Sequence, residues 1–155
     1  MNPLSLLIPA LMMTDPLFVP DTTYHTNEPK LTITQSRIDE VNRKCRASYT
    51  MVEMDDYEKS YILCYRYLAA CWREYRREHK SNPSMETLAR MWYAGSGWAT
   101  NSASKVYWSY VEQNLKRTEE QSRGSVLANP NAKIKTYSHY QGGWKTYSKP
   151  TSSPR

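Results

Sequence analysis

The chain has 155 residues, a net charge of +6, 39% hydrophobic residues and 23% charged residues, which is enough for one globular domain with a modest core. No stretch approaches the ~20 consecutive apolar residues of a membrane-spanning helix, so we expect no membrane span. The three cysteines are an odd number at spacings that match no zinc pattern, which excludes a small disulfide-stapled or zinc-stapled scaffold.

The first elements expected along the chain are a helix, a loop and a second helix. Apolar residues of 4–13 recur at helical spacing, although Pro9 is expected to distort or interrupt that helix. This segment has no basic start and no small-residue cleavage site, so it is interpreted as a helix rather than a signal peptide. The prolines of 15–29 are typical of an irregular loop. Residues 31–33 then predict a short extended piece, and the apolar spacing of 38–41 predicts a helix.

Three more helices are expected before the periodicity ends. Residues 55–79 carry one continuous apolar stripe with charged residues opposite, which predicts a long amphipathic helix. Asn82 is expected to cap the next helix, which should stop near Gly95. A last helix is predicted over 102–117. Its inward-facing residues are expected to be Val106, Tyr107, Tyr110, Val111 and Leu115.

The end of the chain, residues 119–155, is predicted to be an extended basic tail. From Gln121 onward the chain contains Lys and Arg but no Asp or Glu, so its excess positive charge lies here. Such a segment cannot build a core of its own, but its aromatic and basic side chains are suited to anchoring on an acidic partner. The residues expected to make these contacts are Lys133, Lys135, Tyr137, Tyr140, Trp144, Lys145, Tyr147 and Lys149.

The cysteines point to a reducing compartment. Cys64 and Cys71 lie seven residues apart on the long helix, and they are interpreted as core thiols rather than ligands. We therefore expect an intracellular protein (cytoplasmic, cytoskeletal or ciliary) or a component of a virus particle. No metal site and no cofactor are expected.

Residue patterns alone predict little catalytic chemistry. The chain contains no glycine-rich phosphate loop and no HExxH pair. The histidines His25, His79 and His139 are scattered along the sequence, and each is interpreted as a solvated surface residue rather than a general base.

Four segments, in order, resemble landmarks of one known family. Residues 28–34, E-P-K-L-T-I-T, resemble a "G-P-L-Q-I-T" segment, and residues 38–43, I-D-E-V-N-R, resemble "V-D-D-V-N-R". Residues 88–98, L-A-R-M-W-Y-A-G-S-G-W, resemble "L-A-R-I-W-N-G-G-P-x-G-W", and residues 107–111, Y-W-S-Y-V, resemble "Y-W-x-K-V". These patterns are typical of lysozyme-like proteins related to the invertebrate-type (destabilase-like) lysozymes and their cysteine-poor bacterial and phage-like relatives.

The resemblance implies a mainly α protein: a small lysozyme-like helical domain over residues 1–118, followed by the tail. It also implies a sugar-binding groove. The turn that would line that groove consists of Trp92, Tyr93, Ala94, Gly95, Ser96, Gly97 and Trp98.

The departures from the family pattern fall on its chemistry. The family's catalytic glutamate at the end of the first helix corresponds to Asp15, which is followed by Pro16. Aspartate is one methylene shorter than glutamate and more acidic, so both its reach and its protonation near neutral pH are worse. Tyr93 replaces the family's asparagine and is expected to fill the groove. Together these changes predict a lost active site.

Three functions remain open. The first is a non-catalytic structural or interaction subunit of a large assembly, such as a ciliary microtubule lattice or a virion, which is anchored by the tail. The alternative is an active peptidoglycan-cleaving muramidase with Asp15 or Glu28 as its acid, and Asp21 or Glu28 as a second carboxylate. A nucleic-acid binder ranks last, because the tail charges are spaced rather than clustered.

Overall fold

The computed structural model describes residues 2–15 and 31–128 and is mainly α-helical. Its elements are α1 (Pro3–Thr14), α2 (Gln35–Cys45), the 3-10 helix η2 (Met51–Asp55), α3 (Tyr57–His79), α4 (Met85–Ala94), the 3-10 helix η3 (Gly95–Gly97) and α5 (Ser102–Ala128). The chain divides into two compact units, Met1–Glu119 and Glu120–Arg155. None of the helices in the described part of the chain is long and apolar enough to cross a membrane.

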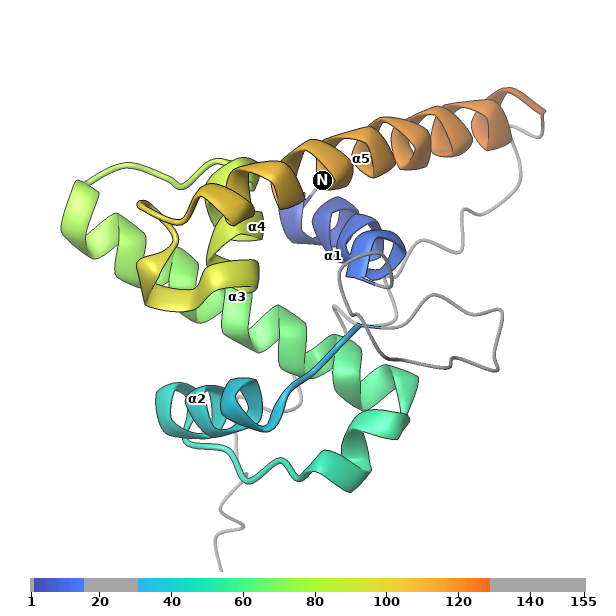
Figure 1. The fold of residues 1–155 in the computed structure, drawn as a ribbon. Helices are drawn as coiled ribbons and strands as arrows, with labels where there is room; N and C mark the ends of the chain where they lie inside the picture. Colours follow the sequence, from blue (N-terminus) through green and yellow to red (C-terminus); the bar gives the residue numbers. More distant parts are fainter. Residues whose placement is uncertain (1, 16–30, 129–155) are drawn as a thin grey trace, which may run out of the picture. The chain divides into compact units, whose positions relative to one another are not determined.

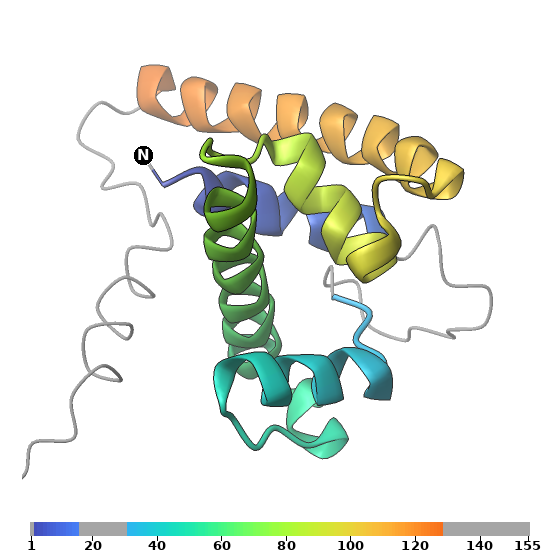
Figure 2. The ribbon, with the colours of Figure 1, turned by 90° about the vertical axis from the view of Figure 1, so that its left-hand side faces the viewer.

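In the first unit, α3 is the element to which most others pack. Helices α1, α2 and α4 and the short η2 all contact it, and α1 also contacts α4. Figures 1 and 2 show α2 and η2 grouped at one end of the ribbon, with α1, α4 and the start of α5 at the other. The core is therefore made mainly by the faces of α1, α3 and α4.

Helix α1 runs through Pro9, so the proline does not interrupt it. Proline removes one backbone donor from the helix, but the packing of this helix compensates for the lost hydrogen bond. Leu7, Ile8 and Leu11 are each 0% exposed, and the helix buries residues on nearly every side. An apolar helix surrounded by protein is held by its neighbours rather than by its intrinsic propensity.

The predicted amphipathic helices are confirmed in α2 and α3. Ile38 and Val41 of α2 are fully buried, as the spacing predicted. Asp56 caps α3 by accepting a hydrogen bond of 3.0 Å from the backbone N–H of Lys59. Cys64 and Cys71 are buried free thiols in the core, as expected.

Two boundaries differ from the predictions. Helix α4 is capped by Ser84, whose hydroxyl accepts from Thr87 N at 3.1 Å, rather than by Asn82. Helix α5 continues to Ala128 instead of ending near Arg117. The residues that follow Arg117 include two glutamates and a glutamine, and these straight side chains favour continuation of a helix. The extended tail was therefore predicted to begin too early, and residues 129–155 lie outside the described residues.

The inward face of α5 was only partly predicted. Tyr107, Val111 and Leu115 are buried, and they follow one another at intervals of four residues. Val106 and Tyr110 are 54% and 42% exposed, because each precedes a buried residue by one position and is rotated by about 100° around the helix. The prediction that these two residues face inward is wrong.

Candidate functional site

Asp15 lies at the C-terminal end of α1, where the sequence placed the residual acid. Asp15 is buried, with an exposed fraction of 4%. The hydroxyl of Tyr107 in α5 donates to Asp15 Oδ1 at 2.6 Å, and the backbone N–H of Thr32 donates to Oδ2 at 3.0 Å. One carboxyl group therefore joins the end of α1, the segment before α2 and the first half of α5.

The surroundings of Asp15 raise the pKa of its carboxyl group toward neutral pH. Burial raises the pKa of Asp15 from 3.8 to about 6. The hydrogen bonds from Tyr107, Thr32 and the Trp92 side chain act against this rise, as does the positive charge of Arg37. Burial also raises the pKa of the Tyr107 hydroxyl well above its usual value, so Tyr107 keeps its proton and remains a donor.

The last turn of α1 makes a second buried connection to α5. The amide Nδ2 of Asn114 donates to Thr14 Oγ1 at 2.8 Å, and the Thr14 hydroxyl donates to Ala10 O at 2.7 Å. Thr14 is fully buried and Asn114 is 7% exposed. The carboxylate is thus one member of a polar network that fastens the end of α1 inside the core.

Thr32, whose backbone holds Asp15, also carries an unusual hydroxyl. Within residues 2–15 and 31–128, its Oγ1 is a buried polar atom without a hydrogen-bond partner. A buried hydroxyl in this state carries a desolvation penalty of about 1–3 kcal/mol.

Aromatic rings cover the Tyr107 side of the site. The ring of Tyr93, at the end of α4, stacks on the Tyr107 ring with centroids 4.8 Å apart and planes 24° apart. Tyr93 is 38% exposed, so it lies at the surface above the buried Tyr107. The predicted groove residue therefore contacts the ring whose hydroxyl binds Asp15.

Arg37 of α2 lies against a second pair of aromatic rings, Tyr67 and Trp92. Its guanidinium is 4.2 Å from the centroid of the Tyr67 ring and 5.1 Å from that of the Trp92 ring, and it donates to the carbonyl oxygen of Trp92. Arg37 also forms an ion pair of 2.8 Å with Glu40. The Tyr67 hydroxyl donates to Glu40 Oε1 at 3.4 Å. Sequence reasoning missed Arg37 and Glu40, although their spacing of three residues places them on one helix face.

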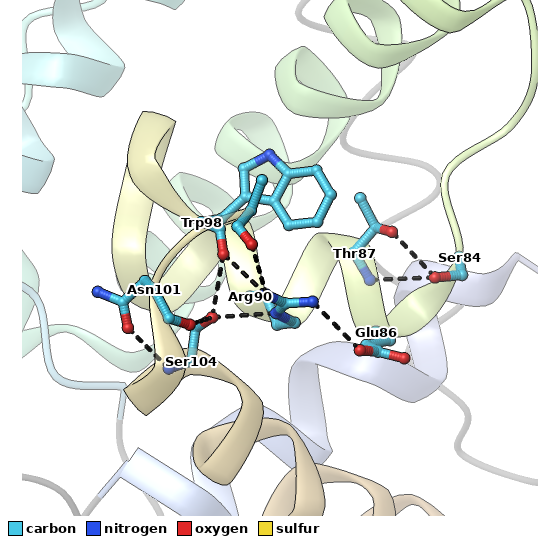
Figure 3. Close-up of polar contacts among 8 residues, drawn as sticks. Ser84, Glu86, Thr87, Arg90, Trp98, Asn101 and Ser104 are labelled. Atoms are coloured by element: carbon cyan, nitrogen blue, oxygen red, sulfur yellow. Dashed lines mark hydrogen bonds and ion pairs between the residues drawn. The ribbon is translucent and has the colours of Figure 1, made fainter.

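The turn after α4 is held by a buried arginine (Figure 3). Arg90 is 7% exposed and donates from Nε to Ser104 Oγ at 3.0 Å and from Nη2 to the Trp98 carbonyl at 2.9 Å. Nη2 also lies 3.3 Å from the Ala99 carbonyl, and Nη1 forms a 3.3 Å ion pair with Glu86. This network fixes the turn between α4 and α5.

Residues 92–98, predicted as the groove turn, span the end of α4 and η3, with Trp92 at the buried end. Gly95 ends α4 with φ of +66°, a conformation that favours glycine. Gly95–Gly97 then forms η3, and the carbonyl of Trp98 accepts from Arg90. Arg90 itself was missed from the sequence. Its place between alanine and methionine in an apolar run was the available signal, since a buried charge needs partners.

Several predicted site residues lie outside the described residues. They are Asp21, Glu28, Lys133, Lys135, Tyr137, Tyr140, Trp144, Lys145, Tyr147 and Lys149. In the part of the chain that is described, no group of three or more His, Cys, Asp or Glu is placed to hold a metal ion. Comparisons with protein-family models, curated proteins and solved structures find no match to this chain.

Proposed function

We propose that this chain is a non-catalytic, lysozyme-like interaction domain that serves as a subunit of a larger protein assembly. The observation that carries the proposal is the state of the Asp15 carboxyl group. Both of its oxygens accept hydrogen bonds from groups of the chain itself, at 2.6 Å and 3.0 Å, and the residue is 4% exposed. The carboxyl group of Asp15, which is the candidate catalytic acid, instead holds the end of α1 to α5 and to the backbone of Thr32.

A general acid in glycoside cleavage must present its proton to the bridging oxygen of the substrate. Tyr107 O–H and Thr32 N–H are both donors, and two donors aimed at a carboxyl group favour its ionised, accepting form. Transfer of a proton to a sugar would require Asp15 to leave at least one of these partners. The arrangement therefore supports a structural role for Asp15.

Tyr93 supports the same proposal from the side of the groove. In the resembled family this position is asparagine, a small polar residue. Here an aromatic ring stacks 4.8 Å from the ring of Tyr107 and covers that side of the Asp15 site. A stacked aromatic pair of this kind contributes about 0.5–1.5 kcal/mol beyond its area burial. Tyrosine at position 93 therefore stabilises the fold, whereas the resembled family has a polar side chain at this position.

The assembly part of the proposal rests on charge. The chain from Gln121 onward has basic residues and no acidic ones, so it complements an acidic protein surface. Hosts with such surfaces include a ciliary microtubule lattice and a virus particle. We favour the microtubule, because its surface is acidic.

One observation favours a second candidate, an active muramidase. Asp15 lies at the end of α1, and burial raises its pKa to about 6. A carboxylic acid that keeps its proton near neutral pH is what a glycosidase acid requires. In this alternative the hydrogen bonds to Asp15 would be exchanged for substrate during the reaction.

A peptidoglycan-clearing assay with the full chain separates the two candidates. Three proteins are compared beside an active lysozyme: the native chain, Asp15→Asn, and a combined Thr14→Val, Asp15→Glu, Tyr93→Asn variant that restores family-like residues. We expect no soluble muropeptides from the native chain. Release of muropeptides by the native chain that disappears in Asp15→Asn would establish the muramidase. Circular dichroism of each variant verifies that it is folded.

The assembly part has its own experiment. The full chain is sedimented with stabilised microtubules before and after the acidic tubulin tails are removed by protease. We expect co-sedimentation that depends on those tails and that weakens when Lys133, Lys135, Lys145 and Lys149 are changed to Gln. Sedimentation that is indifferent to both treatments would remove the microtubule as host.

A further inference from the structure

A group of exposed arginines on α2 and α3 forms a second surface, separate from the tail and from the Asp15 site. Arg43, Arg46 and Arg73 are exposed, and none of them forms an ion pair with another described residue. Arg46 and Arg73, together with Arg66, are named the arginine face. Like charges repel one another, so their grouping needs an explanation.

Two contacts bring the end of α2 to the middle of α3 and so assemble this face. Lys44 and Glu74 form a 2.6 Å ion pair between the two helices. The thiol of Cys45 donates to the carbonyl oxygen of Arg66 at 3.7 Å. Burial raises the pKa of Cys45, and the nearby charges of Arg66, Arg73 and Lys44 oppose that rise. Arg66 and Arg73 therefore lie close to Cys45, and Arg46 is the next residue along the chain.

Arg46 occupies a position that suits another residue better. It is the C-cap of α2 in the left-handed region, with φ of +50°. Glycine is the usual residue at such a cap, because a side chain there carries a steric penalty. Lys80 at the end of α3 is in the same conformation, so both caps place a basic side chain at the C-terminal end of a helix.

The helix dipole accounts for only part of the face. Basic residues at the C-terminal end of a helix stabilise its negative pole, and Arg46 is the C-cap of α2. The last turn of α3 contains other basic residues, and Arg73 lies before it. Arg73 is therefore not explained by this effect.

The surroundings of the arginine face fit a protein partner. The guanidinium of Arg66 lies 5.7 Å from the centroid of the Tyr49 ring, and Met51 and Val52, which follow in the chain, are 43% and 81% exposed. Arginine, tyrosine and methionine are enriched in the centres of protein interfaces. Figure 2 shows α2 and η2 at the same end of the ribbon.

We propose that the arginine face binds a short, carboxylate-rich segment of a partner protein. Arginine forks bind carboxylates through two parallel hydrogen bonds, and the exposed apolar residues of η2 add contact area at the edge. This inference extends the proposed function by adding a surface on the folded domain. It does not depend on the clearing assay, since an active enzyme could carry the same face.

The experiment measures binding of a fluorescein-labelled oligoglutamate peptide to the full chain by fluorescence anisotropy. Lys133, Lys135, Lys145 and Lys149 are first changed to Gln, so that the tail does not contribute. In that background we expect Arg46→Gly with Arg73→Gln to raise Kd about tenfold, as the loss of two arginine–carboxylate contacts predicts.

A matched pair of substitutions controls for net charge and backbone. Lys80 is also a left-handed C-cap, with φ of +57°, and Arg117 is an exposed arginine of α5. Lys80→Gly with Arg117→Gln therefore makes the same chemical changes away from the face, and it should change Kd less than about twofold. Thermal unfolding of Arg46→Gly should occur at the native temperature or above it, so weaker binding cannot be due to unfolding.

Two results would overturn the proposal. Equal weakening by both pairs, or by neither, would show that the peptide responds to overall charge and not to this face. Tighter binding of a labelled oligothymidine strand, lost in Arg46→Gly with Arg73→Gln, would assign the face to nucleic acid instead.

Discussion

The hydroxyl of Tyr107 donates a 2.6 Å hydrogen bond to Oδ1 of Asp15, although 92 positions separate the two residues in the sequence. Both residues are buried, at 1% and 4% exposure. The bond holds the end of α1 against α5 in a place where water cannot substitute for either partner. Buried hydrogen bonds to a charged group contribute about 1.5–3 kcal/mol, so this contact is a substantial part of the stability of a small domain.

Tyr107→Phe should therefore lower the free energy of unfolding by about 1–3 kcal/mol at pH 7, because Asp15 loses a donor while it stays buried. Urea unfolding followed by circular dichroism measures this loss. The matched control is Tyr75→Phe, which removes a hydroxyl from a partly exposed tyrosine of α3. Equal losses in both variants would show that the hydrogen bond to Asp15 has no special weight.

The stability of the domain should depend on pH through Asp15. Its pKa is raised from 3.8 to about 6 by folding, so the folded state binds the proton more tightly than the unfolded state. This contribution is fully present below pH 3.8 and is lost as pH rises toward 6. The contribution of Asp15 to the free energy of unfolding therefore falls by about 3 kcal/mol between pH 3.8 and about 6. Above pH 6 this contribution changes little.

Asp15→Asn isolates this effect, because asparagine has a similar shape and does not titrate. Urea unfolding of both proteins between pH 4 and 7 should show the variant gaining stability relative to the native chain as the pH rises. Other groups titrate in both proteins. The quantity to compare is therefore the difference in unfolding free energy between the native chain and Asp15→Asn at each pH. Parallel curves would mean that folding does not raise the pKa of Asp15.

Thr32→Val should leave the domain equally stable or make it more stable. Valine has the same shape as threonine, keeps the backbone N–H that binds Asp15, and removes a buried Oγ1 that has no partner among the described residues. Removal of an unsatisfied buried hydroxyl relieves a penalty of about 1–3 kcal/mol. A thermal unfolding curve checks the sign, and a clear loss of stability would show that the hydroxyl has a partner in solution.

Arg90→Lys should lower stability by about 2–4 kcal/mol in spite of the conserved charge. Lysine lacks the planar fork that reaches Ser104 and the Trp98 carbonyl together, so buried acceptors lose their donors. Trp98 lies 5.2 Å from the Arg90 guanidinium, so its near-ultraviolet circular dichroism should change as well. Arg117→Lys on the exposed side of α5 should stay within about 0.5 kcal/mol of the native chain.

The helices could be predicted because their signals are local. The stripe of α3 and the pair Ile38 and Val41 repeat at helical spacing, and a repeat of this kind is visible without knowledge of the partners. The path of α1 through Pro9 could not be predicted this way. It depends on burial by α3 and α4, which are far away in the sequence.

The place of Asp15 at the end of α1 could be predicted from the sequence, but its surroundings could not. The resemblance indicated Asp15 and the turn that begins at Trp92, and both lie in the same part of the fold. The partners Tyr107 and Thr32 lie 92 and 17 positions from Asp15, and no local pattern links them. Tyr107 was predicted to face inward, but its role as a donor to Asp15 depends on tertiary packing.

The buried last turn of α1 has a consequence for protein synthesis. Thr14 receives its hydrogen bond from Asn114, 100 positions later in the chain. At roughly 5–20 residues per second, a ribosome needs about 5–20 seconds to make the intervening chain. The apolar side chains of Leu7, Ile8 and Leu11, which are 0% exposed in the finished fold, gain permanent partners only as α3 and α4 are made. Helix α1 is therefore complete only after a residue far along the chain has been made, and a chaperone that binds short apolar segments has this interval in which to hold it.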